Sequence, residues 1–366
     1  MFSFIKFTLK VIILLNPQSA NHGFRVPNSI LTIAAFLEGK YDYLLVDENI
    51  DRNVEQTIAG LIKEKGIKYL GITVMPGLQL HRAAAISKSI KSQFPGLVIL
   101  WGGYFASLHP ETVLKSVYVD YVFRGHSEIS IVEFLDCMEN KPGSKRLENI
   151  SGLSYRSEGR FRHNPKAEIF NPDLIPRLPY EKVPMETYLK ISATFLGPRT
   201  IGYHSSYGCP FLCGFCAVAG VYKGRWLGRS AELVAEDIIF LKEKYNIGAV
   251  EFHDNNFFVS EKRCYDFSER VKHIGIGWWG EARPDTVMKF SDDTWKAIAD
   301  SGCKMIFFGA ESSSDEILKL MDKGGTQTSE TVLELAEDGD RPPGIVRASF
   351  RPHLESQPHH RRSGRL

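Results

Sequence analysis

The sequence is 366 residues long, enough for two domains that each bury their own core. Lys and Arg together number 45 and Asp and Glu 43, so the net charge of +2 gives no field that would recruit nucleic acid or an anionic membrane by itself. Three of the six cysteines are clustered, which indicates a reducing compartment such as the cytoplasm and argues against a secreted disulfide framework.

The apolar N-terminal stretch is predicted to be a buried strand. Lys6 and Lys10 interrupt it, and the uninterrupted part, residues 11–15, is too short for the core of a signal peptide or for a membrane span. A targeting segment is the alternative interpretation.

Strands and helices alternate over residues 10–145. Short apolar runs predict strands at 11–15, 43–46, 69–74, 97–101 and 120–123, and apolar residues at helical spacing predict helices at 27–37, 53–64, 80–93 and 128–138. This alternation is typical of a doubly wound, Rossmann-like parallel α/β sheet, whose ligands lie beyond the carboxyl ends of its strands.

Unusual residues follow three of these strands, namely Thr73, Gly102-Gly103 and Gly125. Glycine lets a backbone approach a ligand closely, although ordinary turns use it as well. Together with the stretches Gly-Gly-Tyr-Phe-Ala-Ser-Leu-His-Pro-Glu and Asp-Tyr-Val-Phe-Arg-Gly, these residues resemble the cobalamin-binding domain that commonly precedes radical S-adenosylmethionine (SAM) barrels. The resemblance implies that Thr73, Gly102, Gly103 and Gly125 line the nucleotide tail or the corrin of cobalamin.

The loop after the first strand departs from that family. Many cobalamin domains carry Asp-x-His-x-x-Gly there, with a His that binds cobalt, whereas residues 16–23 here read Asn-Pro-Gln-Ser-Ala-Asn-His-Gly. His22 is expected to belong to a turn or a polar pocket, with cobalt ligation as the alternative, and the sequence leaves corrinoid binding open.

Residues 146–199 are predicted to form a linker between two domains. The stretch from Gly152 to Phe161 predicts a small hairpin, and prolines at 165, 172, 176, 179, 184 and 198 argue against long helices.

The clearest motif is Cys209, Cys213 and Cys216, which follow a strand predicted at 200–205 in the spacing C-x3-C-x2-C. Three ligands are too few to close a tetrahedral zinc site, and soft thiolates suit an iron–sulfur cluster. With Gly-Cys-Pro at its start and Phe215 before its last Cys, the loop closely resembles the cluster loop of radical SAM enzymes. This resemblance implies a [4Fe–4S] cluster on the three cysteines and SAM on its open iron, with Phe215 among the SAM contacts. Zinc, redox-thiol or incidental cysteines are the alternatives.

Residues 200–350 continue as β/α units, which indicate a partial barrel, and the resemblance implies the radical SAM (β/α)6 fold. Strands are predicted at 249–252, 275–280 and 304–309, and helices at 231–245, 261–273, 292–300 and 314–322. In the family, equivalents of Glu281, Arg283 and Glu311 bind the amino group, carboxylate or ribose of SAM, and Asp254 lies beside the adenosine. Ordinary salt bridges are the alternative for each.

Four further residues of the chain are expected to have packing roles. These residues are His253, Cys137, Cys264 and Cys303.

The C-terminal end breaks the barrel pattern. A helix at 328–337 and a weak strand at 344–350 could continue it, but residues 351–366 are rich in Arg, His and Pro and are predicted to be disordered. The barrel is therefore expected to be incomplete, as in a truncated or frame-shifted family member, with a His-rich metal-binding tail as the alternative.

The two resemblances imply a cobalamin-dependent radical SAM enzyme, and the expected activity is that of a methyltransferase acting on an unactivated carbon of a small molecule. The implied partner is an electron donor such as flavodoxin or ferredoxin, without nucleic acid or a membrane span. Three alternatives stay open: a ring-forming enzyme of the anaerobic cyclase type, a cluster- and corrinoid-binding remnant without turnover, and a zinc-dependent binding module.

Overall fold

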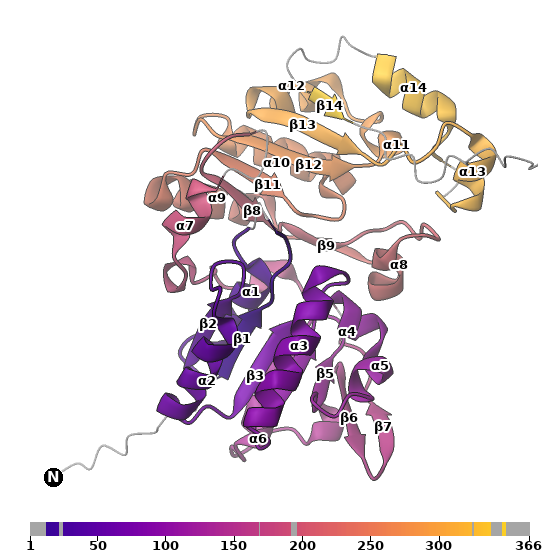
Figure 1. The fold of residues 1–366 in the computed structure, drawn as a ribbon. Helices are drawn as coiled ribbons and strands as arrows, with labels where there is room; N and C mark the ends of the chain where they lie inside the picture. The colour runs from indigo at the N-terminus through magenta and orange to yellow at the C-terminus, as the bar shows by residue number, and fades with distance from the viewer. Residues whose placement is uncertain are drawn as a thin grey trace, which may run out of the picture.

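The computed structural model describes residues 12–21, 25–167, 169–191, 196–323, 326–337 and 346–348. Within these ranges, two mainly parallel sheets lie toward opposite ends of the molecule, and a short two-stranded ladder lies between them (Figure 1). The first residues of the chain, His22 and the 351–366 tail fall outside the described residues. No helix in the described part of the chain is both long and apolar enough to cross a membrane.

The first sheet has the order β2-β1-β3-β4-β5-β6-β7. Strands β1 to β5 are parallel, and the chain leaves β1 on one side for β2 and then on the other for β3, as in a doubly wound sheet. The hairpin expected in the linker is present, and it pairs antiparallel with β5, so it extends this sheet. The strands are β1 (Ile12–Asn16), β2 (Tyr43–Asp47), β3 (Tyr69–Thr73), β4 (Val98–Gly102), β5 (Tyr121–Phe123), β6 (Leu153–Ser157) and β7 (Arg160–His163).

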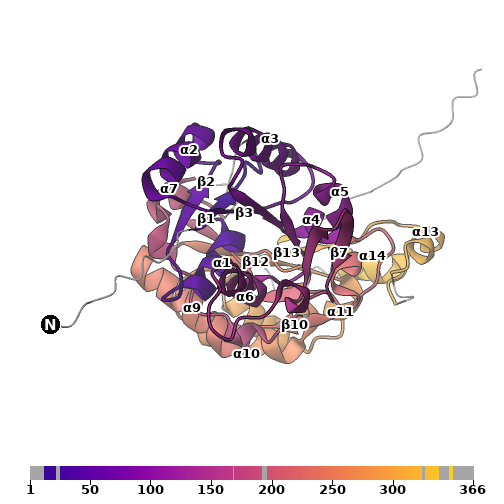
Figure 2. The ribbon, with the colours of Figure 1, turned by 90° about the horizontal axis from the view of Figure 1, so that it is seen from below.

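Helices cover both faces of the first sheet. Ile30 and Phe134 belong to the core on one face, under α1 (Asn28–Leu37) and α6 (Glu128–Met138). Ile58 and Ile86 belong to the core on the other face, under α2 (Val54–Lys65) and α3 (Leu78–Gln93). Figure 2 shows the two pairs on opposite sides of β1 and β3. The faces are closed in this way, so the strand ends are the natural place for a ligand.

The linker contains only short helical pieces, as its prolines predict. These are the turns η1 (Leu147–Asn149), η2 (Pro172–Leu174) and η3 (Tyr180–Lys182) and the helix α7 (Met185–Lys190). Tyr188 of α7 is buried in the second core, and its hydroxyl donates to Asp47 Oδ2 of β2 at 2.7 Å. The linker therefore fastens the two sheets to each other.

The second sheet has the order β14-β13-β12-β11-β8, and all its neighbours are parallel. Strands that lie side by side in chain order are typical of a β/α barrel, and the five strands described here make a partial one. The strands are β8 (Thr200–Tyr203), β11 (Ala249–Phe252), β12 (Gly277–Ala282), β13 (Cys303–Phe308) and β14 (Val346–Ala348).

Helices pack on one face of the second sheet. Phe252 and Trp278 point into this core, where they meet Phe267 of α10 (Glu261–Val271). Side chains alternate along a strand, so residues such as Glu251 and Trp279 lie on the opposite, inner face. The other helical elements are α9 (Ala231–Tyr245), η4 (Phe257–Val259), α11 (Pro284–Val287), α12 (Asp292–Asp300), α13 (Asp315–Leu320) and α14 (Ser329–Glu337).

Candidate functional site

The start of the three-cysteine loop is held in place by a short strand pair and a glycine. The strand predicted at 200–205 is present as β8, which ends at Tyr203. The chain then forms β9 (Ser206–Gly208), which pairs antiparallel with β10 (Trp226–Gly228). Gly208 has a φ of +80°, and a Cβ at this position would collide with the carbonyl oxygen of Arg225. The ladder and this glycine therefore fix where the loop leaves the barrel.

The loop presents the thiols of Cys209, Cys213 and Cys216 between β9 and the helix α8 (Ala217–Tyr222). Cys213 is buried, while Cys209 and Cys216 are partly exposed. Cys216 is the N-cap residue of α8, and the N–H of Gly214 donates to the carbonyl of Met321 at 2.9 Å. Main-chain contacts thus fix the middle of the loop against the segment that follows α13.

The three thiols lie within electrostatic range of one another. Burial raises the pKa of the Cys209 thiol, and charge on Cys213 and Cys216 raises it further. Among the described residues, no three His, Cys, Asp or Glu side chains are arranged to hold a single metal ion. The donor set of the loop consists only of sulfur, which suits an iron–sulfur cluster.

Two buried cations lie beside the thiols. Arg283, whose side chain is 7% exposed, donates from Nη1 to Cys213 Sγ at 3.4 Å, and its guanidinium stacks 3.8 Å from the centroid of the Phe211 ring. Lys323, 4% exposed, interacts with Cys213 through its charge, while burial lowers the pKa of its amine. Positive charge at this point offsets the negative charge of thiolates, which is a second reason that the loop fits an iron–sulfur cluster.

The remaining predicted SAM residues surround the same corner. Glu311 is partly buried, adopts a φ of +63° and lies 3.4 Å from Lys323 Nζ through its Oε1. Glu281 is the penultimate residue of β12, exposed on the inner face and paired in register with Phe307 of β13. Phe215 is 53% exposed, with Lys323 Nζ 5.9 Å from its ring centroid. Glu311, Phe215 and Arg283 are therefore gathered around Lys323.

Asp254 has different surroundings from those residues. It is 1% exposed and accepts hydrogen bonds from the Ser205 N–H at 2.6 Å and from the hydroxyls of Ser205 and Ser206 at 2.5 and 2.7 Å. Burial raises the pKa of Asp254, while nearby Arg263 and these donors lower it. Its carboxylate is thus used to fix the turn between β8 and β9 that carries the cysteine loop.

The predicted cobalamin residues meet at one edge of the first sheet. Thr73 ends β3 and pairs with Gly102, which ends β4. Gly103 has a φ of +91°, and a Cβ there would lie 2.7 Å from the carbonyl oxygen of Val74. Gly125, at φ +81°, makes an isolated bridge to the linker. Close backbone packing accounts for Gly103 and Gly125. At Gly102, by contrast, there is room for a Cβ, which would only contact Ser127 Oγ at 4.0 Å.

This edge faces the carboxyl end of the second sheet. Tyr104 opens helix α4 (Tyr104–Leu108) after Gly103. Its hydroxyl lies 3.3 Å from Oδ1 of Asn255, which is three residues beyond the end of β11. The ring of Tyr104 also lies against that of Tyr222 at the end of α8, with centroids 6.2 Å apart. The cysteine loop is therefore next to the strand ends of both sheets, as Figure 1 shows for α4, α8 and β9.

Buried polar atoms without a partner are present at the same boundary. His126 and Glu128 are 9% and 7% exposed and approach each other at 3.4 Å, yet His126 Nε2 and Glu128 Oε2 have no hydrogen-bond partner. Asn256, next to the contact with Tyr104, is 1% exposed and both polar atoms of its amide are unpaired. Buried polar atoms are normally satisfied, so a ligand that carries amides or hydroxyls fits this boundary.

Sequence reasoning missed several residues of this region because the contacts join distant segments. Tyr104 lies in a stretch that carried the resemblance but was given no role, and Lys323, His126 and Asn256 lie outside the quoted motifs. The only sequence signal was position, since Tyr104, His126 and Asn256 each follow a predicted strand end.

Family comparisons agree with this arrangement. The family described as B12 binding domain matches residues 23–135, and the radical SAM superfamily matches residues 203–345. The chain combines a B12-binding domain with a radical SAM domain. The fold class predicted from the sequence is thereby confirmed, and the cofactors of this family are those expected: a [4Fe–4S] cluster, SAM and cobalamin.

Curated relatives of this radical SAM protein include methyltransferases and a cyclase. It is 30% identical over 304 residues to an uncharacterized methyltransferase of Pyrococcus horikoshii, covering 82% of this chain and 64% of the relative. It is 23% identical over 336 residues to the anaerobic magnesium-protoporphyrin IX monomethyl ester cyclase of a Synechocystis strain, covering 88% and 66%. The chain thus spans about two thirds of the length of these relatives.

A solved structure supports the fold. The radical SAM methyltransferase TsrM from Kitasatospora setae, with cobalamin and a [4Fe–4S] cluster bound, superposes with a TM-score of 0.75 at 17% identity, covering 93% of this chain and 68% of that one. At this identity, the likeness shows that the B12-binding and radical SAM domains share that architecture.

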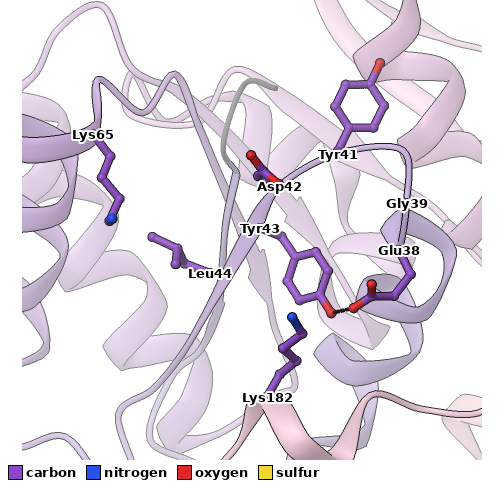
Figure 3. Close-up of a pocket in the computed structure, with 8 residues that line it drawn as sticks. All are labelled: Glu38, Gly39, Tyr41, Asp42, Tyr43, Leu44, Lys65 and Lys182. Atoms are coloured by element: carbon purple, nitrogen blue, oxygen red, sulfur yellow. Dashed lines mark hydrogen bonds between the residues drawn. The ribbon is translucent and has the colours of Figure 1, made fainter. Parts of the chain in front are cut away.

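A cavity of about 350 Å³ lies away from this site, at the opposite end of the first sheet (Figure 3). Tyr43 and Asp42 at the start of β2 line it, together with Lys65 and Lys182. The Tyr43 hydroxyl donates to Glu38 within it. Ligands of doubly wound sheets bind at the carboxyl ends of the strands, so this cavity is separate from the cofactor site.

Proposed function

We propose that the protein is a cobalamin-dependent radical SAM methyltransferase that acts on an unactivated carbon of a small molecule. The observation that carries the proposal is the cysteine loop, whose three thiols lie beside two buried cations and next to the strand ends of both sheets. When bound, the cluster and SAM supply a 5′-deoxyadenosyl radical, and cobalamin supplies the methyl group.

We assign a role to each candidate residue from its surroundings in the structure. Cys209, Cys213 and Cys216 are proposed to hold the cluster. Glu281 and Glu311 are proposed to pair with the ammonium of SAM or accept hydrogen bonds from its ribose hydroxyls, since a carboxylate suits both groups. Phe215 is exposed on the loop and is proposed to cover the adenosine. Asp254 is proposed to act at a distance, by holding the turn before the loop.

The first domain is proposed to hold the corrinoid at its carboxyl edge. Gly102 leaves space there, and Thr73 lies beside it in the neighbouring strand. Gly103 and Gly125 are proposed to line the site through their main chain. The unpaired atoms of His126 and Asn256 support this placement, because corrin side chains are amides that can satisfy them.

Domain limits follow as part of the proposal. We assign residues 10–145 to the cobalamin-binding domain, 146–199 to the linker and 200–350 to the radical SAM domain. The hairpin within the linker packs with the first domain. A one-electron donor such as flavodoxin or ferredoxin is the proposed partner, and the six free cysteines suit a reducing compartment, the cytoplasm.

Anaerobic reconstitution of the whole chain tests the proposal. Iron, sulfide and cobalt contents are measured first, and 5′-deoxyadenosine is then assayed after addition of SAM and a reductant. We expect about four irons per chain by the stoichiometry of the cubane, and production of 5′-deoxyadenosine. Cys213→Ala should lose both, whereas Cys137→Ala, which changes a cysteine of the first domain, should keep both.

Other outcomes distinguish the alternatives. Iron without SAM cleavage would indicate a cluster-binding remnant, and zinc without iron or sulfide would contradict the proposal. A cyclase is the second candidate, because the Synechocystis cyclase is among the relatives. SAM carrying a deuterated methyl group separates the two, since only a methyltransferase places that methyl group in the product.

A further inference from the structure

Arg283 has contacts that differ from those of a SAM-binding residue. Its Nε donates to Asp285 Oδ1 at 3.0 Å, and its Nη2 donates to Asp285 Oδ2 at 3.1 Å. Nη2 also donates to the Lys323 carbonyl at 2.5 Å, and Nη1 points at Cys213 Sγ at 3.4 Å. Four of the five N–H donors of the guanidinium are therefore directed at protein atoms.

The fork of Arg283 is already occupied. An arginine grips a carboxylate through two parallel N–H bonds, and here the Nε and Nη2 edge makes that pair with Asp285. Asp285 is itself held, since the hydroxyl of Thr326 also donates to it. A SAM carboxylate that bound this edge would have to displace Asp285. The Asp285 side chain is only 5% exposed, so the loss of its ion pair would leave a buried carboxylate unpaired at a large cost in free energy.

The remaining side of the guanidinium is aimed at the cysteine loop. The ring of Phe211, two residues after Cys209, lies 3.8 Å from the guanidinium carbon and covers one of its faces. Arg283 is the N-cap residue of α11, so its backbone is fixed at the end of β12. The stacking, the ion pair and the backbone position together direct one N–H of Nη1 toward Cys213.

We infer that Arg283 is a positioning residue of the iron–sulfur cluster: its N–H and charge at the Cys213 sulfur hold the loop and raise the reduction potential of the cluster. The inference rests on the cluster ligation in the proposed function. An electron added to the cluster increases its negative charge, and a cation that donates to a ligand sulfur stabilises that reduced state. Removing the cation therefore shifts the potential to more negative values.

The test is an EPR-monitored redox titration of the reconstituted whole chain, with mediators and dithionite as reductant. Arg283→Gln should shift the midpoint potential to a more negative value than wild type, while SAM affinity, measured by equilibrium dialysis, stays within about twofold. Arg199→Gln is the matched control, because Arg199 is a linker residue whose guanidinium pairs with Glu186. It should leave the potential unchanged.

A measurement on wild type keeps the inference testable if Arg283→Gln holds no iron. Protein labelled with ¹⁵N at the arginine guanidinium should show a ¹⁵N hyperfine coupling to the reduced cluster in pulsed EPR, and its absence would overturn the inference. An unchanged potential in Arg283→Gln with full iron, or a tenfold loss of SAM affinity without a potential shift, would also overturn it. Wild type that takes up no cluster would instead contradict the proposed function.

Discussion

An ion pair between the two domains gives the sharpest stability prediction. Arg25, in the loop before α1, reaches the inner face of the second sheet and pairs with Glu251 of β11, with Nη2 3.2 Å from Oε1. The Glu251 side chain is 0% exposed, and His253 Nε2 lies 3.2 Å from its other oxygen. Arg25→Gln would therefore leave a buried carboxylate with a single weaker partner.

The expected cost follows from that burial. Removing one partner of a buried ion pair costs ~3–5 kcal/mol, and the lower end applies here because the Arg25 side chain is 30% exposed. A loss of about 3 kcal/mol is a change of roughly a hundredfold in the unfolding equilibrium constant. Urea denaturation of Arg25→Gln, Glu251→Gln and the double variant gives the coupling free energy, and the double variant should recover part of the loss.

The pH dependence of stability supplies an internal check. Burial alone raises the pKa of Glu251, but hydrogen bonds from His253 and Arg25 lower it below its usual value of 4.5. Because the folded-state pKa is lowered, the stabilisation is fully present above the unfolded-state pKa, and it is lost as the pH falls through the folded-state pKa. Arg25→Gln should flatten this acid dependence. Single variants that each cost less than about 1 kcal/mol and add without coupling would refute the reasoning.

Three further changes have defined outcomes. Gly208→Ala forces a Cβ into the carbonyl of Arg225 at a positive φ, so it should lower the free energy of unfolding by at least ~1–3 kcal/mol, measured by thermal or urea unfolding, and lower the iron content. Gly96→Ala places its Cβ in open space and should change neither quantity. Asp254→Asn places an amide N–H₂ against donors, so urea unfolding should show a loss of ~2 kcal/mol; unchanged stability with weaker SAM binding would instead favour direct contact with SAM. Tyr188→Phe should cost ~1–2 kcal/mol by urea unfolding through loss of the hydrogen bond to Asp47, and a cost near zero would show that this contact does not join the domains.

Sequence periodicity located the elements that carry strong patterns. Helix 231–245 and strand 249–252 are confirmed to the residue, and Ser291 accepts a hydrogen bond from the Thr294 N–H at the start of α12, as a cap should. Apolar spacing determines these elements locally. The ladder of β9 and β10 was missed because three-residue strands carry too little pattern to separate them from a loop.

The three thiols of the candidate site could be predicted from the sequence, whereas the residues that pack around them could not. Thiol spacing is a local property, so Cys209, Cys213 and Cys216 were readable from the chain. Lys323 is 40 residues from Arg283, and only the folded barrel brings the two together. Which residue contacts which is a property of packing, and single-sequence patterns contain little of it.

The short segment from Met321 to Lys323 joins two parts of the site. The carbonyl of Met321 receives the N–H of Gly214 in the cysteine loop, and the carbonyl of Lys323 receives Nη2 of Arg283. The cysteine loop and the guanidinium of Arg283 are thus both bonded to one stretch of main chain that is three residues long. Substitutions in α13 that displace this stretch would therefore disturb the cysteine loop and Arg283 together, although α13 itself contributes neither of them.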